Sequence, residues 1–154
     1  MPASATRPKT ILLVEPDDAV RAALVSAVGP RAEVEVHAGF ESARGRVLSA
    51  FDFLVTPLRL GEYNGLHLVI LAKSGASSTT AVVYAEEGDL TLASNVQRLG
   101  AFFELARRMP IVLPGYLGST LPSQDRRDPL RFDRRAHSRG GRRAWDSHLM
   151  GPTG

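Results

Sequence analysis

Short apolar runs alternate with amphipathic segments along most of this chain, and no other feature constrains its fold as strongly. The first run covers residues 10–15 and reads Thr-Ile-Leu-Leu-Val-Glu. A continuous apolar run of this length is typical of a strand covered on both faces, as strands of parallel sheets are. Runs of similar character predict four more strands, at residues 33–37, 51–56, 81–84 and 101–105.

The segments between these strands have the spacing of helices that bury one face. In residues 19–28, the apolar side chains of Val20, Leu24 and Val28 recur at every fourth position. The same reasoning predicts helices at residues 40–50, 65–73, 89–99 and 114–121. The last of these should be short and marginal, because it contains two glycines.

Strands that alternate with helices of this length imply right-handed crossovers and a parallel sheet between two helix layers. We therefore predict an α/β fold, a doubly wound five-stranded parallel sheet. In such a fold a binding or reaction site lies at the carboxyl ends of the strands.

Charge and composition divide the chain into a body and two ends. The net charge is +3, yet beyond Pro122 the sequence holds eight arginines and four aspartates with few aliphatic residues. Such a composition buries too little apolar surface to offset chain entropy. The expected organisation is a flexible N-terminus at 1–9, one domain at 10–121, and a disordered Arg-rich tail at 122–154.

Several classes of protein are disfavoured by what the sequence lacks. It has no cysteine, which excludes disulfides and thiolate zinc sites, and its four histidines are scattered. No apolar run approaches the roughly 18 residues that a membrane span needs, and residues 1–9 lack the apolar stretch of a secretion signal. Glycine-rich phosphate loops and other common catalytic motifs are also absent. We expect a cytoplasmic protein that is not an enzyme and does not contact membranes.

Four segments together resemble the receiver domain of bacterial response regulators, the CheY-like family. They are Ile-Leu-Leu-Val-Glu-Pro-Asp-Asp-Ala-Val-Arg at 11–21, Phe-Asp-Phe-Leu-Val-Thr-Pro-Leu-Arg-Leu at 51–60, Tyr-Asn-Gly-Leu at 63–66 and Leu-Gly-Ala at 99–101. Their order and spacing agree with the family over about residues 10–118. The resemblance implies a flavodoxin-like receiver fold and a role in two-component, phosphorelay signal transduction.

The resemblance also implies a chemistry that this chain has lost. In receivers, an aspartate at the end of the third strand accepts a phosphoryl group held by Mg²⁺. Here that position is Pro57, which has no nucleophile. A small hydroxyl is expected at the end of the fourth strand, where this chain has Tyr84.

The acidic pair and the lysine of the family are altered as well. The pair would fall on Pro16 and Asp17, so that Asp17 is a remnant metal ligand that Glu15 or Asp18 could partly supplement. Asp17 and Asp18 are nevertheless better explained as helix-capping residues. Direct counting places the lysine position at Arg107, whereas the Met109-Pro110 pair places it at Met109, an alignment we favour slightly.

The expected function follows from these departures. We predict a pseudo-receiver without a cofactor, with weak or absent Mg²⁺ binding, that binds a histidine kinase or an output protein independently of phosphorylation. The family's contact face of helix four, strand five and helix five is weakened by the poor fifth helix, which leaves the oligomeric state open. One alternative is nucleic-acid or anionic-surface binding through the tail, although aspartates interleave with its arginines. The other is a truncated, non-functional receiver.

Overall fold

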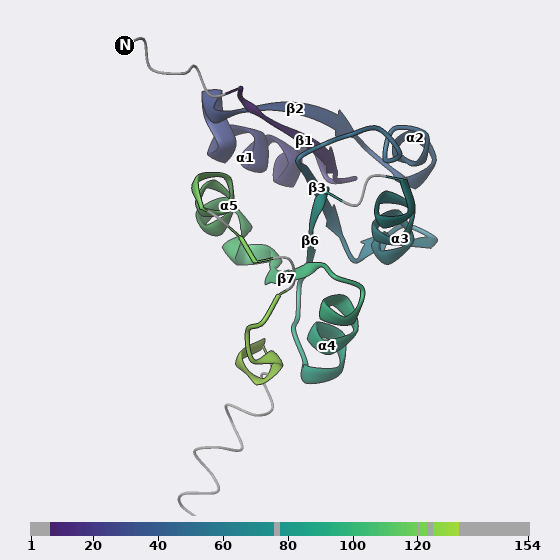
Figure 1. The fold of residues 1–154 in the computed structure, drawn as a ribbon, viewed down its shortest axis with the longest axis vertical. Helices are drawn as coiled ribbons and strands as arrows, with labels where there is room; N and C mark the ends of the chain where they lie inside the picture. The colour runs from purple at the N-terminus through teal and green to yellow at the C-terminus, as the bar shows by residue number, and fades with distance from the viewer. Residues whose placement is uncertain (1–6, 76–77, 120, 123–124, 133–154) are drawn as a thin grey trace, which may run out of the picture.

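A five-stranded parallel sheet forms the centre of the molecule (Figure 1). The computed structural model describes residues 7–75, 78–119, 121–122 and 125–132. The sheet strands are β1 (Lys9–Val14), β2 (Ala32–His37), β3 (Phe53–Pro57), β6 (Thr80–Ala85) and β7 (Phe102–Leu105). A separate antiparallel pair is formed by β4 (Arg59–Leu60) and β5 (Tyr63–Asn64).

The strand order is β2-β1-β3-β6-β7, and every neighbouring pair in the sheet is parallel. This is the flavodoxin-like order, in which the chain reverses direction across the sheet after its first two strands. The predicted α/β, doubly wound fold is confirmed. The reversal places the carboxyl ends of β1 and β3 side by side, and β6 follows on the other side of β3.

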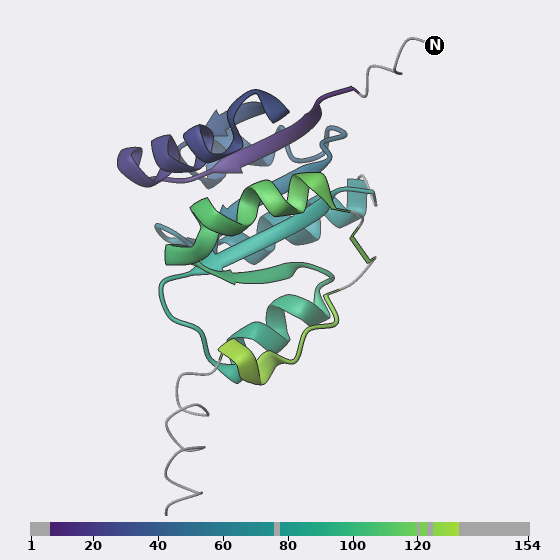
Figure 2. The same ribbon diagram turned by 90° about the vertical axis from the view of Figure 1, so that its left-hand side faces the viewer.

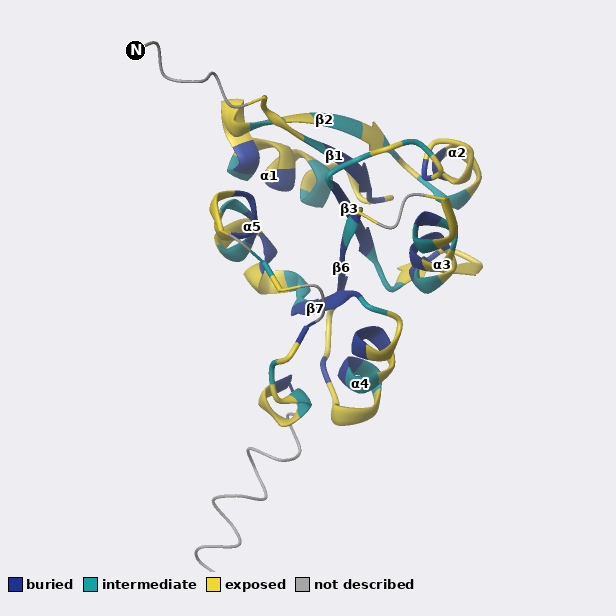
Figure 3. Ribbon diagram, viewed as in Figure 1, coloured by how far each residue is buried: buried dark blue, intermediate teal, exposed yellow. Residues whose placement is uncertain are grey.

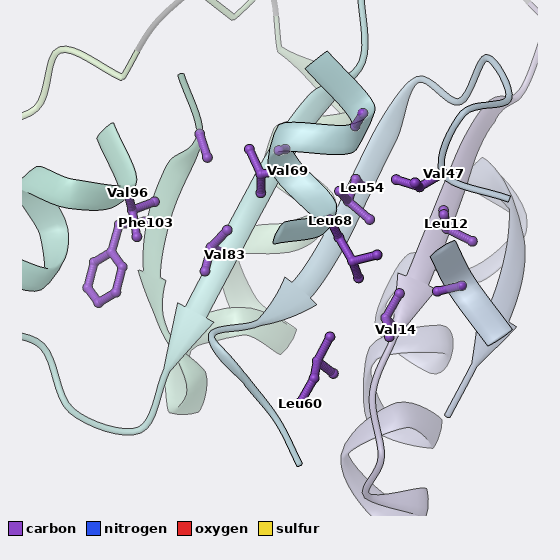
Figure 4. Close-up of a cluster of buried hydrophobic side chains, with 14 of the residues drawn as sticks. Leu12, Val14, Val47, Leu54, Leu60, Leu68, Val69, Val83, Val96 and Phe103 are labelled. Atoms are coloured by element: carbon purple, nitrogen blue, oxygen red, sulfur yellow. The ribbon is translucent and has the colours of Figure 1, made fainter. Parts of the chain in front are cut away.

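Helices cover both faces of this sheet. Helices α1 (Asp18–Val28) and α5 (Met109–Gly118) lie on one face, and α2 (Phe40–Arg44), α3 (Gly65–Gly75) and α4 (Leu90–Arg98) lie on the other (Figure 1). The core beneath α2, α3 and α4 includes Leu12, Leu54, Leu68, Val83 and Phe103 (Figure 4). No helix in the described residues combines the length and the apolar composition that crossing a membrane requires.

Two helices differ from the sequence prediction. α2 ends at Arg44 rather than at residue 50, and its C-cap is Gly45, a residue of weak helix propensity. α5 begins at Met109, five residues before the predicted start, so Pro114 lies inside the helix rather than in its first turn. Burial of Met109 and Leu113 against the sheet outweighs the poor propensity of proline and glycine.

The domain also extends further than predicted. We expected disorder from residue 122 onward, yet Asp125 and Phe132 are buried, with 5% of each residue exposed. The turn Pro129–Phe132 lies beside α4 (Figure 2). The expectation of disorder is therefore wrong for residues 125–132, because Phe132 completes the core around Phe103. Residues 133–154 of the expected tail and 1–6 of the expected flexible N-terminus lie outside the described residues.

Candidate functional site

The carboxyl ends of three adjacent strands bring together Glu15, Pro57 and Tyr84. Glu15 directly follows β1, Pro57 ends β3, and Tyr84 is the penultimate residue of β6. Pro57 and Tyr84 are register partners in the parallel pairing of β3 with β6. This is the edge of the sheet at which doubly wound proteins place their sites.

A buried pair formed by Tyr84 and Glu15 closes this site. The Tyr84 hydroxyl donates a hydrogen bond to Oε2 of Glu15, and the backbone N–H of Asp17 donates to Oε1 at 2.9 Å. Only 2% of Tyr84 and 6% of Glu15 are exposed. Because β3 lies between β6 and β1, the phenol must reach across the end of β3 to meet the carboxylate. Both carboxylate oxygens of Glu15 are thereby engaged within the protein.

The phenol of Tyr84 is held in its neutral form. Burial, and secondarily the hydrogen bond and negative charge of Glu15, raise the pKa of Tyr84 well above its ordinary value. A neutral phenol donates a hydrogen bond to the carboxylate without adding charge to the buried site. The pair is therefore a stable structural feature at neutral pH.

Pro57 contributes backbone rather than reactive side chain to the site. Its carbonyl oxygen accepts a hydrogen bond from the hydroxyl of buried Thr56 at 3.0 Å. The next N–H, of Leu58, donates to the carbonyl of Tyr84 at 2.8 Å and continues the pairing with β6. The end of β3 is thus joined to β6, and it presents no nucleophile to the site.

Gly65 is a site residue whose role the sequence analysis did not identify. A Cβ placed on Gly65 would lie 2.1 Å from the carbonyl oxygen of Pro57 and 2.9 Å from Oγ1 of Thr56. Its N–H donates to the carbonyl of Leu58 at 2.7 Å. Only glycine allows the start of α3 to pack this closely on the end of β3, and the Asn64-Gly65 pair was the available signal.

The two aspartates after β1 belong to the start of α1. Asp17 is the N-cap, and its Oδ1 accepts from the N–H groups of Ala19 at 2.9 Å and Val20 at 3.0 Å. Asp18 is exposed and forms an ion pair with Arg21. The carboxylate that faces the neighbouring strand ends is that of Glu15, which the sequence analysis considered only as a supplement to Asp17.

These residues do not fit a Mg²⁺ site of the kind that the family resemblance implies. Mg²⁺ needs carboxylate oxygens that converge in octahedral geometry. Both oxygens of Glu15 already accept hydrogen bonds, and Asp17 caps a helix. In the part of the chain that the structure describes, no three acidic or histidine side chains form a group that could hold a metal ion.

The candidate lysine positions occupy different environments after β7. Met109 is 1% exposed and packs in the core between the sheet and the α1–α5 layer. Arg107 is exposed on the turn Ala106–Arg108. The buried position therefore carries an uncharged thioether, and the arginine lies on the surface.

Asp52, the aspartate closest in sequence to Pro57, lies at the opposite, amino-terminal ends of the strands. It precedes the first residue of β3, and its Oδ2 accepts from the N–H of Thr10 at 2.8 Å and from the Thr10 hydroxyl at 3.1 Å. Burial opposes its ionisation, but the hydrogen bonds from Thr10 and the charge of Arg7 lower its pKa overall. Asp52 ties β1 to β3 at their amino ends and cannot replace a carboxylate at position 57.

Comparison with known proteins supports the fold at low sequence identity. The sequence matches no protein-family model and no curated protein. Among solved structures, it is similar to the BeF3-activated receiver domain of DrrB, an OmpR/PhoB homologue from Thermotoga maritima, with 16% identity and a TM-score of 0.67. The match covers 73% of this chain and 96% of that one.

Two further structures agree with this. A CheY-like receiver domain protein from Methanospirillum hungatei JF-1 matches with 17% identity and a TM-score of 0.62, covering 73% of this chain and 95% of that one. The response-regulator domain of Thermotoga maritima CheB matches with 16% identity and a TM-score of 0.63 over the same shares of the two chains. This chain therefore has the fold of response-regulator receiver domains.

Proposed function

We propose that this protein is a pseudo-receiver of two-component signal transduction, which binds a protein partner without being switched by phosphorylation and without catalysing a reaction. The observation that carries this proposal is the buried Tyr84–Glu15 pair beside Pro57. It occupies the strand ends where a phosphoryl group and its cation would have to bind. The receiver fold supports a signalling role, and the closed site supports independence from phosphate.

The chemistry of the site supports this in three respects. Position 57 carries a pyrrolidine ring that cannot attack phosphorus. Both oxygens of Glu15 already accept a hydrogen bond, from the Tyr84 hydroxyl and the Asp17 N–H, which leaves fewer lone pairs to coordinate a cation. A cation that displaced either hydrogen bond would leave a buried donor unsatisfied, which costs free energy.

Intact-protein mass spectrometry after incubation with acetyl phosphate and Mg²⁺ tests the proposal. We expect no added mass for the wild-type protein, since no aspartate lies at the acceptor position. The Pro57→Asp variant should also remain unmodified, because the Tyr84 hydroxyl is still hydrogen-bonded to Glu15 and Asp17 still caps α1. A phosphorylatable receiver treated in parallel is the positive control.

Two outcomes would contradict the proposal. Stable, Mg²⁺-dependent phosphorylation of the wild type on any aspartate would mean that the acceptor lies elsewhere. Phosphorylation of the Pro57→Asp variant alone would mean that Glu15, Asp17 or Asp18 still holds a cation, so that a single substitution separates this protein from a working receiver.

For one arginine of the expected tail, Arg127, the contacts argue against the alternative function of nucleic-acid binding. Arg127 forms ion pairs with Glu104 and Asp125, and only 25% of its side chain is exposed. A guanidinium held in this way is not available to phosphates in solution. The arginines at 134, 135, 139, 142 and 143 lie outside the described residues.

A further inference from the structure

One edge of the sheet is covered by the chain's own C-terminal segment, residues 125–132, which we call the strap. β2, at one edge, has only intermediate and exposed residues, whereas β7, at the other edge, is almost entirely buried (Figure 3). An edge strand presents unpaired N–H and C=O groups that template pairing with another chain. The strap supplies hydrogen-bond partners for the N–H and C=O groups of Phe103 in β7.

Side chains of the strap form hydrogen bonds with backbone groups of β7, where a neighbouring strand would otherwise use its own backbone. Oδ2 of Asp125 accepts a hydrogen bond from the backbone N–H of Phe103 at 3.3 Å. The guanidinium of Arg127 donates to the backbone carbonyl of the same residue, with Nη2 at 2.7 Å from the oxygen. Asp125 and Arg127 therefore supply the acceptor and the donor that an added strand would supply.

Charged groups fix the register of the strap on β7. Glu104 is 3% exposed, and its Oε1 accepts from Nη1 of Arg127 and, at 2.6 Å, from the hydroxyl of Tyr116 on α5. Arg127 also forms two hydrogen bonds of 2.9 Å to Asp125, through Nε and Nη2. Charge-assisted bonds of this kind are directional, so an arginine is required at this position of an occupant.

An aromatic side chain completes the recognition. The ring of Phe132 packs edge to face on that of Phe103, with 5.0 Å between centroids, and the Arg127 guanidinium lies 5.1 Å from the Phe132 ring. A Cβ on Gly88 would lie 2.6 Å from the Phe132 carbonyl oxygen, so the loop before α4 has room for the strap only because residue 88 is glycine. The ring of Phe132 therefore packs against the core beside β7, and its backbone lies close to Gly88.

The strap does not fill all the space beside β7. A cavity of about 520 Å³ remains between the strap and α5, and its apolar wall includes Phe102, Val112 and Leu121. Arg126, between the two residues that bind the β7 backbone, also lines this cavity. An occupant with an apolar side chain at that position would bury surface that the strap leaves open, and could therefore displace it.

We propose that the edge of β7 is a peptide-binding site that the strap occupies in place of a partner. The partner segment has an acidic residue, then an apolar residue, then arginine, and an aromatic residue five positions after the arginine, as in Asp125, Arg127 and Phe132 of the strap. This deepens the proposed function, on which it rests for the premise that the domain binds proteins. The strap holds the site closed until such a segment competes for it.

A direct binding experiment tests this with the full-length protein. A strap-release variant, Asp125→Ala with Arg127→Ala, removes the strap's two anchors and leaves Phe103, Glu104 and Tyr116 intact. The probe is a fluorescent peptide with the sequence of residues 125–132, Asp-Arg-Arg-Asp-Pro-Leu-Arg-Phe. Fluorescence anisotropy should give saturable binding to the release variant, and binding at least about tenfold weaker to the wild type, because the tethered strap competes at a high effective concentration.

Matched peptides and variants define the site. A peptide with both alanine substitutions should not bind, and a peptide with leucine in place of Arg126 should bind more tightly. Glu104→Gln in the release variant should weaken binding of the unmodified peptide. Phe132→Ala is a second way to release the strap, which keeps both polar anchors and leaves the site on the body unchanged, and it should also increase peptide binding.

Other results would overturn the proposal. It fails if the folded release and Phe132→Ala variants, checked by circular dichroism, do not bind the peptide, or if the wild type and these variants bind it equally well. Self-association of the release variant in analytical ultracentrifugation, without peptide binding, would instead mean that the bare edge pairs with a second copy. None of these results depends on phosphorylation, which the mass measurement tests separately.

Discussion

Gly65 is the residue that determines how closely α3 approaches the site. Its missing side chain leaves room for the carbonyl oxygen of Pro57, which a Cβ would approach to 2.1 Å. The atom that would be displaced belongs to the backbone of a central strand, so it cannot move without disturbing the pairing with β6. The conformation of the end of β3 therefore depends on this glycine.

We expect Gly65→Ala to lower the free energy of unfolding by about 1–3 kcal/mol or more, which is typical of overpacking against a rigid neighbour. Urea unfolding followed by circular dichroism measures this. Gly45→Ala is the matched control, because nothing lies within 4 Å of a Cβ there. Its φ of −71° is ordinary, so alanine should leave stability unchanged or raise it by up to about 1 kcal/mol. Equal effects at the two positions would contradict the close approach at Gly65.

Among the elements, the strap departs furthest from what its composition indicates. It is rich in arginine and aspartate, yet its charges are arranged so that Asp125, Glu104 and Arg127 satisfy one another on the edge of β7. Burial opposes the ionisation of Asp125, but the hydrogen bonds and charge of Arg127 outweigh it and lower the pKa of the carboxyl. The strap therefore stays charged and attached at neutral pH.

Limited trypsin digestion with mass spectrometry tests this attachment. We expect the protease-resistant body to extend through Phe132, because the Arg127 carbonyl accepts a hydrogen bond from Gln97 and the Arg127 side chain is bound to Phe103. In the strap-release variant, cleavage after Arg126 or Arg131 should become rapid. Early loss of residues 127–132 from the wild type would show that the strap is not part of the folded domain.

Across the whole molecule, two buried phenols lie next to buried carboxylates: Tyr84 next to Glu15, and Tyr116 next to Glu104. Burial first, and then the adjacent carboxylate, raises the pKa of each phenol far above its ordinary value. A group whose pKa is higher in the folded state stabilises that state below its unfolded pKa, near 10 for tyrosine, and loses this contribution as the pH rises. Stability should therefore be lost on the alkaline side.

We expect the urea midpoint to be level near pH 8 and to fall progressively above about pH 10. Tyr84→Phe should make this fall shallower, because one of the two phenols no longer ionises on unfolding. Exposed Tyr63 is an internal reference that can titrate without unfolding, although its hydrogen bond to Glu41 raises its pKa. Ionisation of all three tyrosines near pH 10 in a native protein, followed by absorbance at 295 nm, would contradict the burial of the two pairs.

The fold, and the absence of a nucleophilic side chain at position 57, could be predicted from the sequence because both follow from local features. Burial on two faces forces apolar runs such as residues 11–14, and amphipathic spacing marks α1, α3 and α4 to within a few residues. Pro57 excludes a nucleophile by its own covalent structure. The prediction from helix propensity placed α5 too late in the chain. Burial of its side chains against the sheet stabilises the helix more than its two glycines and Pro114 destabilise it.

Only the tertiary structure decided which side chains meet at the carboxyl ends of the strands and what covers the edge strand β7. Glu15 and Tyr84 are 69 residues apart, and Phe103 and Asp125 are 22 apart, so no local pattern marks either contact. The composition of residues 125–132 is polar enough to suggest disorder. They pack against the domain because Arg127 forms ion pairs with two carboxylates and Phe132 packs on the ring of Phe103. The free energy of a buried charge depends on the partners that the fold brings to it, and those partners are distant in sequence.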